Sequence, residues 1–361
     1  MTDPSHDEKR GRWLLYGANG YTGELIAREA VRRGMKPILA GRSAEKIATL
    51  AKELGCEHRA FTIEDQTATL VALQDASAVL NCAGPFSSTA GRMMQACLAL
   101  HIHYIDITGE IDVFELAHSL HEKAQRARIV LCPGVGFDVV PTDCVAAKLH
   151  EALPDATYLA LAFESSSRMS IGTAKTSIEN AGRGGRVRKD GAIIDVSLGY
   201  KERRIDFGDG PRETVTIPWG DVSTAYFTTH IPNIEVYVAG LPGIAKQMRQ
   251  LNKLRWLIRR GIVKWLVKRS FARRGPGPDQ TERECNPTNV WGEVVNATGK
   301  KKVAHLRTAN AYVVTIHSSL AILSTLLERQ VESGYTTPAK LMGARFIETL
   351  PGSSAIRISD T

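Results

Sequence analysis

Short apolar runs alternate with amphipathic helical stretches through the first 140 residues of the chain. Such alternation is typical of βαβ units built around a parallel sheet. We therefore predict that residues 12–140 form a doubly wound α/β domain, preceded by a flexible leader over residues 1–11. The expected strands are Trp13–Tyr16, Pro37–Ala40, His58–Ile63, Ala78–Cys82, His103–Ile107 and Arg128–Cys132.

The pattern changes after Gly136, where strand-like runs and helical stretches no longer follow a regular order. This change indicates a second, mixed α+β substrate domain over residues 141–307. Residues 308–361 are predicted to form C-terminal helices that pack back on the fold, one of them over Val313–Leu327. In the second domain we expect strands at Tyr158–Phe163, Ala192–Val196, Thr214–Ile217, Glu235–Val238, Val290–Asn296 and Lys302–Arg307, with helices near Pro141–Leu149 and Thr173–Ala181.

The stretch from Thr308 to Leu327 carries no formal charge and is long enough to raise the question of a membrane span. It also contains Asn310, His317 and several hydroxyl side chains, which a span would have to bury in hydrocarbon. We therefore favour a buried helix of the folded protein over a transmembrane helix.

Composition and cysteine usage are those of an ordinary globular protein. Of the 361 residues 43% are hydrophobic and 23% charged, and the six cysteines form no CxxC pair. No disulfide framework is expected, and the polar first ten residues are unlike a secretion signal. We expect a reducing, cytoplasmic location, with peripheral attachment at the inner face of a membrane as a further option.

The positive charge of the chain is concentrated in one segment. Eleven Lys and Arg residues and no acidic residue lie between Val236 and Pro278, so the rest of the chain sums to 8 − 11 = −3. Apolar residues recur at helical spacing within residues 243–274, with Trp256 and Trp265 among them. This segment is predicted to be a basic amphipathic helix, either on an anionic membrane surface or packed on its own domain. Nucleic acid is not an expected partner, because no recognisable binding module accompanies the charge.

A glycine-rich loop follows the first predicted strand and opens the first predicted helix. In a Rossmann-type domain the first glycines of such a loop let the backbone turn tightly and approach a pyrophosphate. The last glycine allows close helix packing, and the helix N-terminus offers free N–H groups to phosphate. The predicted cofactor-binding residues of this loop are Gly17, Asn19, Gly20, Tyr21, Thr22 and Gly23.

The end of the second predicted strand favours NADP(H) as the cofactor. Enzymes that use NAD usually carry an acidic residue at this point, but this chain has Arg42 and Ser43. An arginine can hold a 2′-phosphate by charge-assisted hydrogen bonds, and the serine hydroxyl can add another. The alternative is an arginine in a solvated loop. Asp65, just past the third strand, is a candidate acceptor for the adenine amine, or an ordinary surface aspartate.

The loop after the fourth predicted strand lies where the crevice of a doubly wound sheet opens. We expect its backbone to border the nicotinamide ribose of the cofactor. The predicted contacts are Asn81, Ala83, Gly84 and Pro85.

These motifs, taken in order, resemble those of saccharopine dehydrogenase-like oxidoreductases, and most of all the trans-acting enoyl reductases. The resemblance implies an NAD(P)-binding domain with an inserted substrate domain and, in that branch, a link to lipid or polyketide-lipid assembly. It does not imply saccharopine as the substrate. It rests on Gly17–Gly23, Ala40–Ser43, Asn81–Phe86, Tyr104–Glu110 and Pro133–Asp138, and further on Ser170–Ala174 and Gly275–Pro278.

Candidate catalytic residues lie at strand and loop ends near the expected cofactor. Tyr104, Asp106 and Glu110 are predicted to line the active cleft, without an assigned proton donor. Alternatively Tyr104 fills the core, Asp106 caps a turn and Glu110 begins a helix. No metal site is expected, since HExxH and CxxC motifs are absent and the pair His101 and His103 lacks a third ligand.

Three functions stay open at this point. The first is an NADP(H)-dependent oxidoreductase, specifically an enoyl reductase acting on a lipid or polyketide-type acyl substrate, free or carrier-linked. The second is a catalytically inactive NADP(H)-binding protein associated with lipid or membrane, and the third is an amino-acid dehydrogenase of the saccharopine type. The oligomeric state is left open, a homodimer included.

Overall fold

The computed structural model describes residues 11–165, 184–240, 243–253 and 277–360. Most of the predicted leader and basic segment, the helix expected near Thr173–Ala181, and the Ser170–Ala174 motif lie outside these residues. The chain divides into two compact units. The first comprises Met1–Thr108, Asp112–Gly136 and Thr315–Thr336, and the second comprises Gly109–Ile111, Phe137–Val314 and Thr337–Thr361.

The first unit is built on a seven-stranded parallel sheet of order β15-β6-β5-β4-β1-β2-β3. Because the strand order reverses between β1 and β4, the crevice typical of doubly wound folds opens beyond the carboxyl ends of these two strands. The prediction of a doubly wound domain is confirmed. The strands are β1 Trp13–Tyr16, β2 Ile38–Gly41, β3 His58–Ala60, β4 Ala78–Asn81, β5 His103–Asp106, β6 Val130–Cys132 and β15 Gly334–Tyr335.

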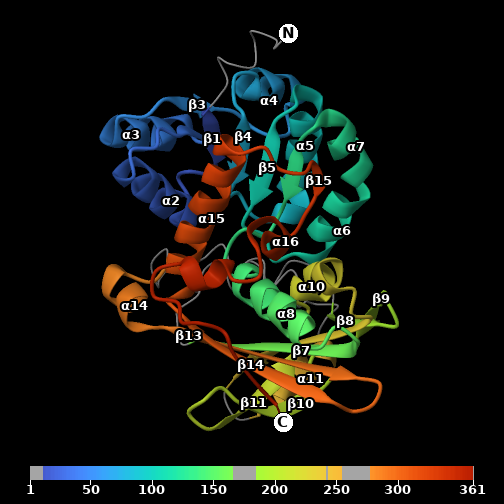
Figure 1. Cartoon of the computed structure of the whole chain (residues 1–361). Helices are drawn as coiled ribbons and strands as arrows, with labels where there is room; N and C mark the ends of the chain where they lie inside the picture. The colour runs from blue at the N-terminus through green and yellow to red at the C-terminus, as the bar shows by residue number, and fades with distance from the viewer. Residues whose placement is uncertain (1–10, 166–183, 241–242, 254–276, 361) are drawn as a thin grey trace. The chain divides into compact units, whose positions relative to one another are not determined.

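Helices flank this sheet, as Figure 1 shows for α2 and α3 on one side of the central strands and α5 to α7 on the other. The central strands are buried along their whole length, in keeping with the continuous apolar runs of the sequence. The helices are α2 Tyr21–Arg32, α3 Ala44–Leu54, α4 Gln66–Leu73, α5 Phe86–Leu100, α6 Ile111–Ser119 and α7 His121–Ala127.

The second unit contains a nine-stranded mixed sheet, whose main path runs β10-β11-β12-β7-β13-β14-β16, with β8 and β9 paired off β12. Only β7 and β12 pair in parallel; the other recorded pairs are antiparallel. The strands are β7 Ala156–Ser165, β8 Gly185–Lys189, β9 Ala192–Val196, β10 Glu202–Asp206, β11 Pro211–Thr216, β12 Asn233–Ala239, β13 Thr288–Asn296, β14 Lys301–Thr308 and β16 Arg357–Asp360.

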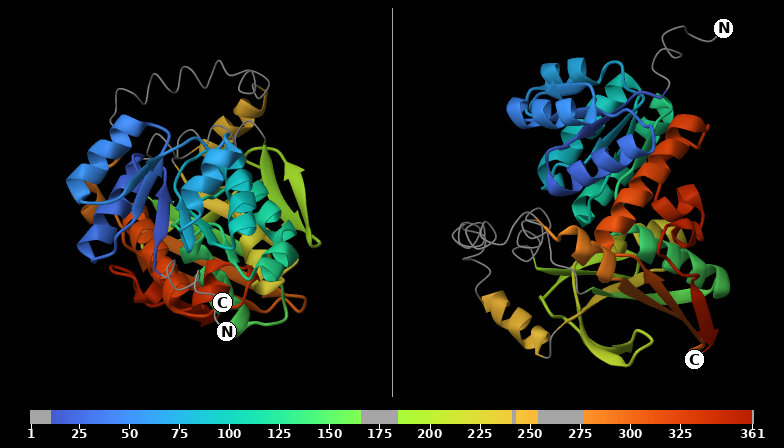
Figure 2. Two further views of the ribbon diagram at one scale, coloured as in Figure 1. Left: turned by 90° about the horizontal axis from the view of Figure 1, so that it is seen from above. Right: turned by 90° about the vertical axis from the view of Figure 1, so that its left-hand side faces the viewer.

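The two faces of this second sheet are covered differently. Helix α8 (Val140–Ala152) packs on one face, where a Cβ at Gly292 would lie 2.6 Å from Val145 Cγ1. On the other face β10 and β11 curl over the sheet, as the yellow-green strands in the right-hand view of Figure 2 show. A small hydrophobic cluster fills this curl: Ala160, Ala162, Ile205, Phe207, Tyr237, Trp291 and Val303. Further helices in the described part of this unit include α10 Asp221–Thr229, α11 Ile244–Lys253 and α14 Gln280–Cys285.

The C-terminal segment contributes more than the helices we expected. Besides α15 (Ala311–Glu328), α16 (Pro338–Met342) and a 3-10 turn at Phe346–Thr349, it supplies one strand to each sheet. β15 pairs in parallel with β6, and β16 pairs in antiparallel with β14. The sequence analysis expected helices here but did not expect these two strands, because such short strands form by pairing with an existing edge and have little apolar pattern of their own.

Helix α15 has the length and composition of a membrane span, with a mean hydropathy of 1.4. However, 56% of it is buried within the protein. Its polar side chains are also hydrogen-bonded inside the fold, since the Ser318 hydroxyl donates to the Val135 carbonyl at 2.6 Å and that of Ser319 donates to the Thr315 carbonyl at 2.5 Å. These contacts support the buried-helix interpretation.

Candidate dinucleotide site

The glycine loop between β1 and α2 folds tightly against the two neighbouring strand ends. Gly17 has a φ of 81°, and its N–H donates to the Ala40 carbonyl at 2.8 Å. A Cβ at Gly17 would lie 2.9 Å from the backbone nitrogen of Ala83, so a larger residue would push the two loops apart. Glycine is therefore required at this position both by conformation and by the close approach of the loop after β4.

Close packing of α2 on the loop depends on Gly23. A Cβ on this residue would lie 2.3 Å from the Gly17 carbonyl oxygen, well inside van der Waals contact. Gly20 occupies the N-cap position with extended backbone, and no side chain caps the helix. The N-terminus of α2 thus carries no side-chain cap, and its place directly after the glycine loop fits the pyrophosphate of a dinucleotide.

Arg42 and Ser43 at the end of β2 have the setting that a 2′-phosphate site requires, and their role in binding the cofactor stays a prediction. Arg42 is exposed, and within the described part of the chain its guanidinium makes no hydrogen bond or ion pair. Ser43 is the N-cap residue of α3, yet its hydroxyl makes no capping bond. A serine at this position usually caps its helix, so both the hydroxyl and the helix N-terminus are left to an anion beside Arg42.

Asn19 links the glycine loop to this strand end. Its Oδ1 would lie 2.9 Å from a Cβ at Gly41, so the absence of a side chain on Gly41 makes room for it. Asp65 has a local role, because its Oδ1 accepts the Ala68 N–H at 2.9 Å and so caps α4. The contact between Asp65 and the adenine stays a prediction.

A buried hydrogen-bond network holds the loop after β4. Asn81 Oδ1 accepts the Ala83 N–H at 3.0 Å, and Asn81 Nδ2 donates to the Tyr104 hydroxyl at 3.3 Å. Thr89, which the sequence analysis did not single out, donates to the Ala83 carbonyl at 2.7 Å. The peptide bond between Gly84 and Pro85 is cis. The conformation of the predicted ribose-binding loop is therefore set by side chains beneath it.

The same network engages Tyr104 and Asp106, two of the predicted cleft residues. The Tyr104 hydroxyl donates to Asp106 Oδ2 at 2.6 Å, and Asp106 Oδ1 accepts the N–H groups of Thr108 at 3.0 Å and Gly134 at 2.9 Å. Burial, followed by the charge of Asp106, raises the pKa of Tyr104 well above its ordinary value. With their hydrogen bonds used in this way, both residues position the loops around the crevice, which favours the structural alternative for each.

Glu110, the third predicted cleft residue, belongs to the second unit. It is buried just before the first residue of α6. Its catalytic role stays a prediction, as do those of Tyr104 and Asp106.

Gly134 donates its N–H to Asp106 and has a φ of 77°. The sequence pointed to this glycine only as a member of the Pro133–Asp138 motif. This hydrogen bond could not be predicted from the sequence, because Asp106 and Gly134 are 28 residues apart and the pairing of β5 with β6 brings them together.

His101 and His103, at which no metal site was expected, both contact backbone groups through their rings. His103 Nδ1 accepts the Val130 N–H at 3.0 Å, and His101 Nδ1 lies 2.9 Å from the Ala127 carbonyl oxygen. Burial lowers the pKa of His103 to about 4, so its ring is neutral at physiological pH.

Fold and site together define a dinucleotide-binding domain of the Rossmann type, joined to a second unit with a mixed sheet. Comparison with known proteins specifies the domain further. Residues 13–132 match the family model "Saccharopine dehydrogenase NADP binding domain". This part of the chain is therefore similar to the NADP-binding domain of saccharopine dehydrogenases, in agreement with the predicted resemblance and with NADP(H) as the predicted cofactor.

Relatives of two kinds match this part of the chain. The saccharopine dehydrogenase-like oxidoreductase of Bos taurus is 27% identical over 150 residues, which cover 36% of this chain and 35% of the relative. The trans-acting enoyl reductase of Mycobacterium leprae is 33% identical over 156 residues, or 40% of this chain and 37% of the relative. The matches thus span little more than a third of these proteins.

The similarity of fold extends further than that of sequence. The structure of apo saccharopine dehydrogenase (L-Glu forming) from Saccharomyces cerevisiae is similar with a TM-score of 0.68 at 10% identity. The likeness covers 97% of this chain and 99% of that one. It shows that the fold is shared, including a second unit of the same architecture, and carries no information on the substrate.

Proposed function

We propose that the protein is an NADP(H)-dependent oxidoreductase that uses the dinucleotide site of the first unit. The observation that carries this proposal is the set of phosphate-binding groups around the glycine loop: the N-terminus of α2, which has no side-chain cap, the exposed Arg42, and Ser43, whose hydroxyl makes no capping bond. The glycine loop and α2 would hold the pyrophosphate, and Arg42 and Ser43 would hold the 2′-phosphate. Bound NADPH supplies a hydride; the protein supplies its orientation.

The loop after β4 is suited to orienting the nicotinamide half of the cofactor. Asn81, Thr89 and, through Tyr104, Asp106 hold this loop by hydrogen bonds from below. A loop held in this way keeps one geometry when the cofactor binds, and a fixed geometry is what hydride transfer needs. We assign these residues a positioning role in the proposed reaction.

For the substrate we propose an α,β-unsaturated acyl thioester of the lipid or polyketide type, free or carrier-linked. This proposal rests on the relatives named trans-acting enoyl reductase, 32–33% identical to this chain over the matched residues. Reduction of such a thioester adds a hydride at the β-carbon and a proton at the α-carbon, with the developing enolate oxygen stabilised by a hydrogen-bond donor.

The test is NADPH consumption by the full chain, after NADPH binding has been established by fluorescence titration. The substrates are trans-2-enoyl thioesters of increasing chain length, each as a coenzyme A and as a pantetheine thioester. Oxidation of NADPH with any of them, lost in the Gly23→Ala variant, supports the proposal. Tight NADPH binding without turnover of any thioester favours the alternative of an inactive cofactor-binding protein. Reduction of NADP⁺ by saccharopine would instead favour the amino-acid dehydrogenase.

Membrane attachment through residues 243–274 is a separate proposal. The described part of this segment, α11, is helical and carries Lys246, Arg249 and Lys253. Flotation with liposomes that contain anionic lipid tests it, and the expected result is binding that is lost when Lys264, Lys268 and Arg269 are changed to Glu. Binding that is absent, or indifferent to this change, favours a helix packed on its own domain and a simple cytoplasmic location.

A further inference from the structure

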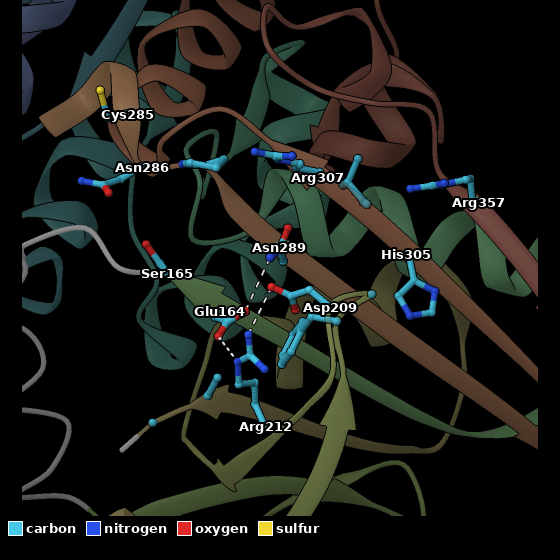
Figure 3. A pocket seen from close by; sticks show the side chains of 16 residues that line it. Glu164, Ser165, Asp209, Arg212, Cys285, Asn286, Asn289, His305, Arg307 and Arg357 are labelled. Carbon is cyan, nitrogen blue, oxygen red and sulfur yellow. Dashed lines mark hydrogen bonds and ion pairs between the residues drawn. The ribbon is translucent and has the colours of Figure 1, made fainter. Parts of the chain in front are cut away.

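The second unit contains a cavity of about 850 Å³ at one end of its sheet. Figure 3 shows side chains from several strands and the β10–β11 turn around this cavity. The volume lies in the range of sites that enclose whole small molecules. The dinucleotide site contributes none of the lining residues, all of which belong to the second unit.

The register of the sheet gathers polar side chains on the floor of the cavity. Glu164 on β7 pairs with Asn289 on β13, which pairs in turn with Arg307 on β14. One step along the strands His305 on β14 pairs with Arg357 on β16. Because residues paired across neighbouring strands, and residues two apart on one strand, face the same side of a sheet, these five side chains share one face.

The charges on this floor are unequally compensated. Arg212 donates to Glu164 Oε1 at 2.9 Å and contacts Asp209 Oδ2 at 3.1 Å, so these three groups form an ion-paired cluster of net charge 1 − 2 = −1 at one side of the cavity. Arg307 and Arg357 are exposed, and within the described residues neither guanidinium makes an ion pair or hydrogen bond. Two uncompensated arginines facing one cavity form a site for an anion.

His305 lies on the same face of the sheet, opposite Arg357 and two residues from Arg307. Its Nε2 lies 3.1 Å from the Asp206 carbonyl oxygen, an acceptor only, so Nε2 carries the proton of the neutral ring. This leaves Nδ1 of the neutral ring as an acceptor. Apolar side chains complete the wall, with Phe207 and Ala239 joining the cavity to the hydrophobic cluster under the curled strands.

We propose that this cavity binds a small molecule that carries a phosphate group on an apolar body. The forked N–H donors and two positive charges of the guanidinium groups match a phosphate monoester, with three acceptor oxygens and close to two negative charges, better than a carboxylate with a single charge. The apolar body packs toward Phe207. The site is independent of the proposed oxidoreductase activity.

The experiment is calorimetric titration of the full chain saturated with NADP⁺, so that the dinucleotide site is filled. Phenyl phosphate is the probe, with inorganic phosphate, benzoate and phenol for comparison. We expect phenyl phosphate to bind at one site per chain, more tightly than each of the other three. Arg307→Gln and Arg357→Gln should each weaken this binding about tenfold or more, since each loses a charge-assisted hydrogen bond.

The matched control is Arg204→Gln, which removes the same charge from an exposed residue of β10 that does not line the cavity. Unchanged binding in this control, with loss in the two cavity variants, supports the proposal. Equal loss of binding in all three variants would mean that only the net charge of the protein matters, and would overturn the proposal. Benzoate binding as tightly as phenyl phosphate overturns the assignment of a phosphate, and absence of phenyl phosphate binding overturns the site.

Discussion

Both units hold arginines without an acidic partner among the described residues, but these sites arise in different ways. Arg42 follows directly after β2 and lies beside Ser43, so its setting is made by its neighbours in the sequence. Arg307 and Arg357 come together only because β16 pairs with β14. Other arginines of both units are paired, for example Arg59 with Asp75 and Arg203 with Glu293. A sequence motif can therefore mark a site such as that of Arg42, but not one such as that of Arg307 and Arg357.

The largest effect is expected from Gly23→Ala, which breaks the first site alone. The new Cβ would lie 2.3 Å from the Gly17 carbonyl oxygen, so the loop must shift, at a cost of about 1–3 kcal/mol in unfolding free energy. NADPH binding should fall below detection in a fluorescence titration, while phenyl phosphate binding stays unchanged. The control is Gly91→Ala, whose Cβ would meet only the Leu116 side chain, at 3.2 Å. NADPH affinity retained in Gly23→Ala would contradict the loop assignment.

Next in size is Arg42→Glu, which tests the charge rather than the shape of the first site. We expect NADPH affinity to fall by about tenfold to a hundredfold, because a charge-assisted contact is replaced by repulsion. NADH has no 2′-phosphate, so its affinity should change little. Lys36→Glu is the matched charge reversal, at an exposed residue before β2 rather than after it. Similar losses in both variants, or unchanged NADPH affinity in Arg42→Glu, would sink the specificity argument.

One buried group in each unit should make the unfolding free energy depend on pH, and the two groups act in opposite directions. In the first unit this group is His103. Its pKa of about 4 in the folded state lies below the ordinary 6.5, so its contribution to stability is complete above pH 6.5 and is lost as the pH falls toward 4. His103→Asn, which keeps an acceptor for the Val130 N–H, should reduce the loss of unfolding free energy between pH 7 and 4.5 by about 2–3 kcal/mol.

Urea unfolding at the two pH values measures this difference. His58→Asn changes an exposed histidine of the same sheet and serves as the control. If His103→Asn is as acid-sensitive as the wild type, the neutral, buried ring is not a source of acid lability.

Asp221 in the second unit gives the smallest and opposite effect. It is fully buried, and neither carboxyl oxygen has a hydrogen-bond partner among the described residues. Burial raises its pKa well above the ordinary value, so the folded protein holds this proton where the unfolded chain releases it, and stability is lost as the pH rises. Asp221→Asn, which is neutral at every pH, should lose less unfolding free energy than the wild type between pH 5 and 8.

Asp195→Asn, an exposed replacement on β9, is the control for this measurement. A steeper loss of stability toward pH 8 in Asp221→Asn than in the wild type would contradict the prediction.

Much of the first unit could be predicted because its signals are local. Five of its first six strands are short, largely buried runs and β3 is largely exposed, while the observed bounds of all six differ from the expected ones only at the ends. In the second unit β9 was predicted with the observed bounds, but β8 and β10 were missed. Both carry several charged residues that interrupt the apolar pattern: β10 is largely exposed, whereas β8 holds the buried Arg188.

The roles of site residues divide in the same way. Glycines and Arg42 could be assigned from their place after strands, because the carboxyl ends of parallel strands form the crevice. Tyr104 and Asp106 stand at equally suggestive positions, yet their side chains bond to each other beneath the loop. A tyrosine at the end of a strand has the same sequence signal whether its hydroxyl enters the crevice or the core.

The sequence by itself determined the parallel sheet, the glycine loop and the preference for NADP, because each depends on residues within one βαβ stretch. Only the tertiary structure decided which strand the C-terminal residues join, how the hydrogen bonds of Asp106 are used, and that Arg307 and Arg357 face one cavity. These features depend on pairing between segments distant in sequence, and such pairing is set by the packing of the whole sheet rather than by any local pattern.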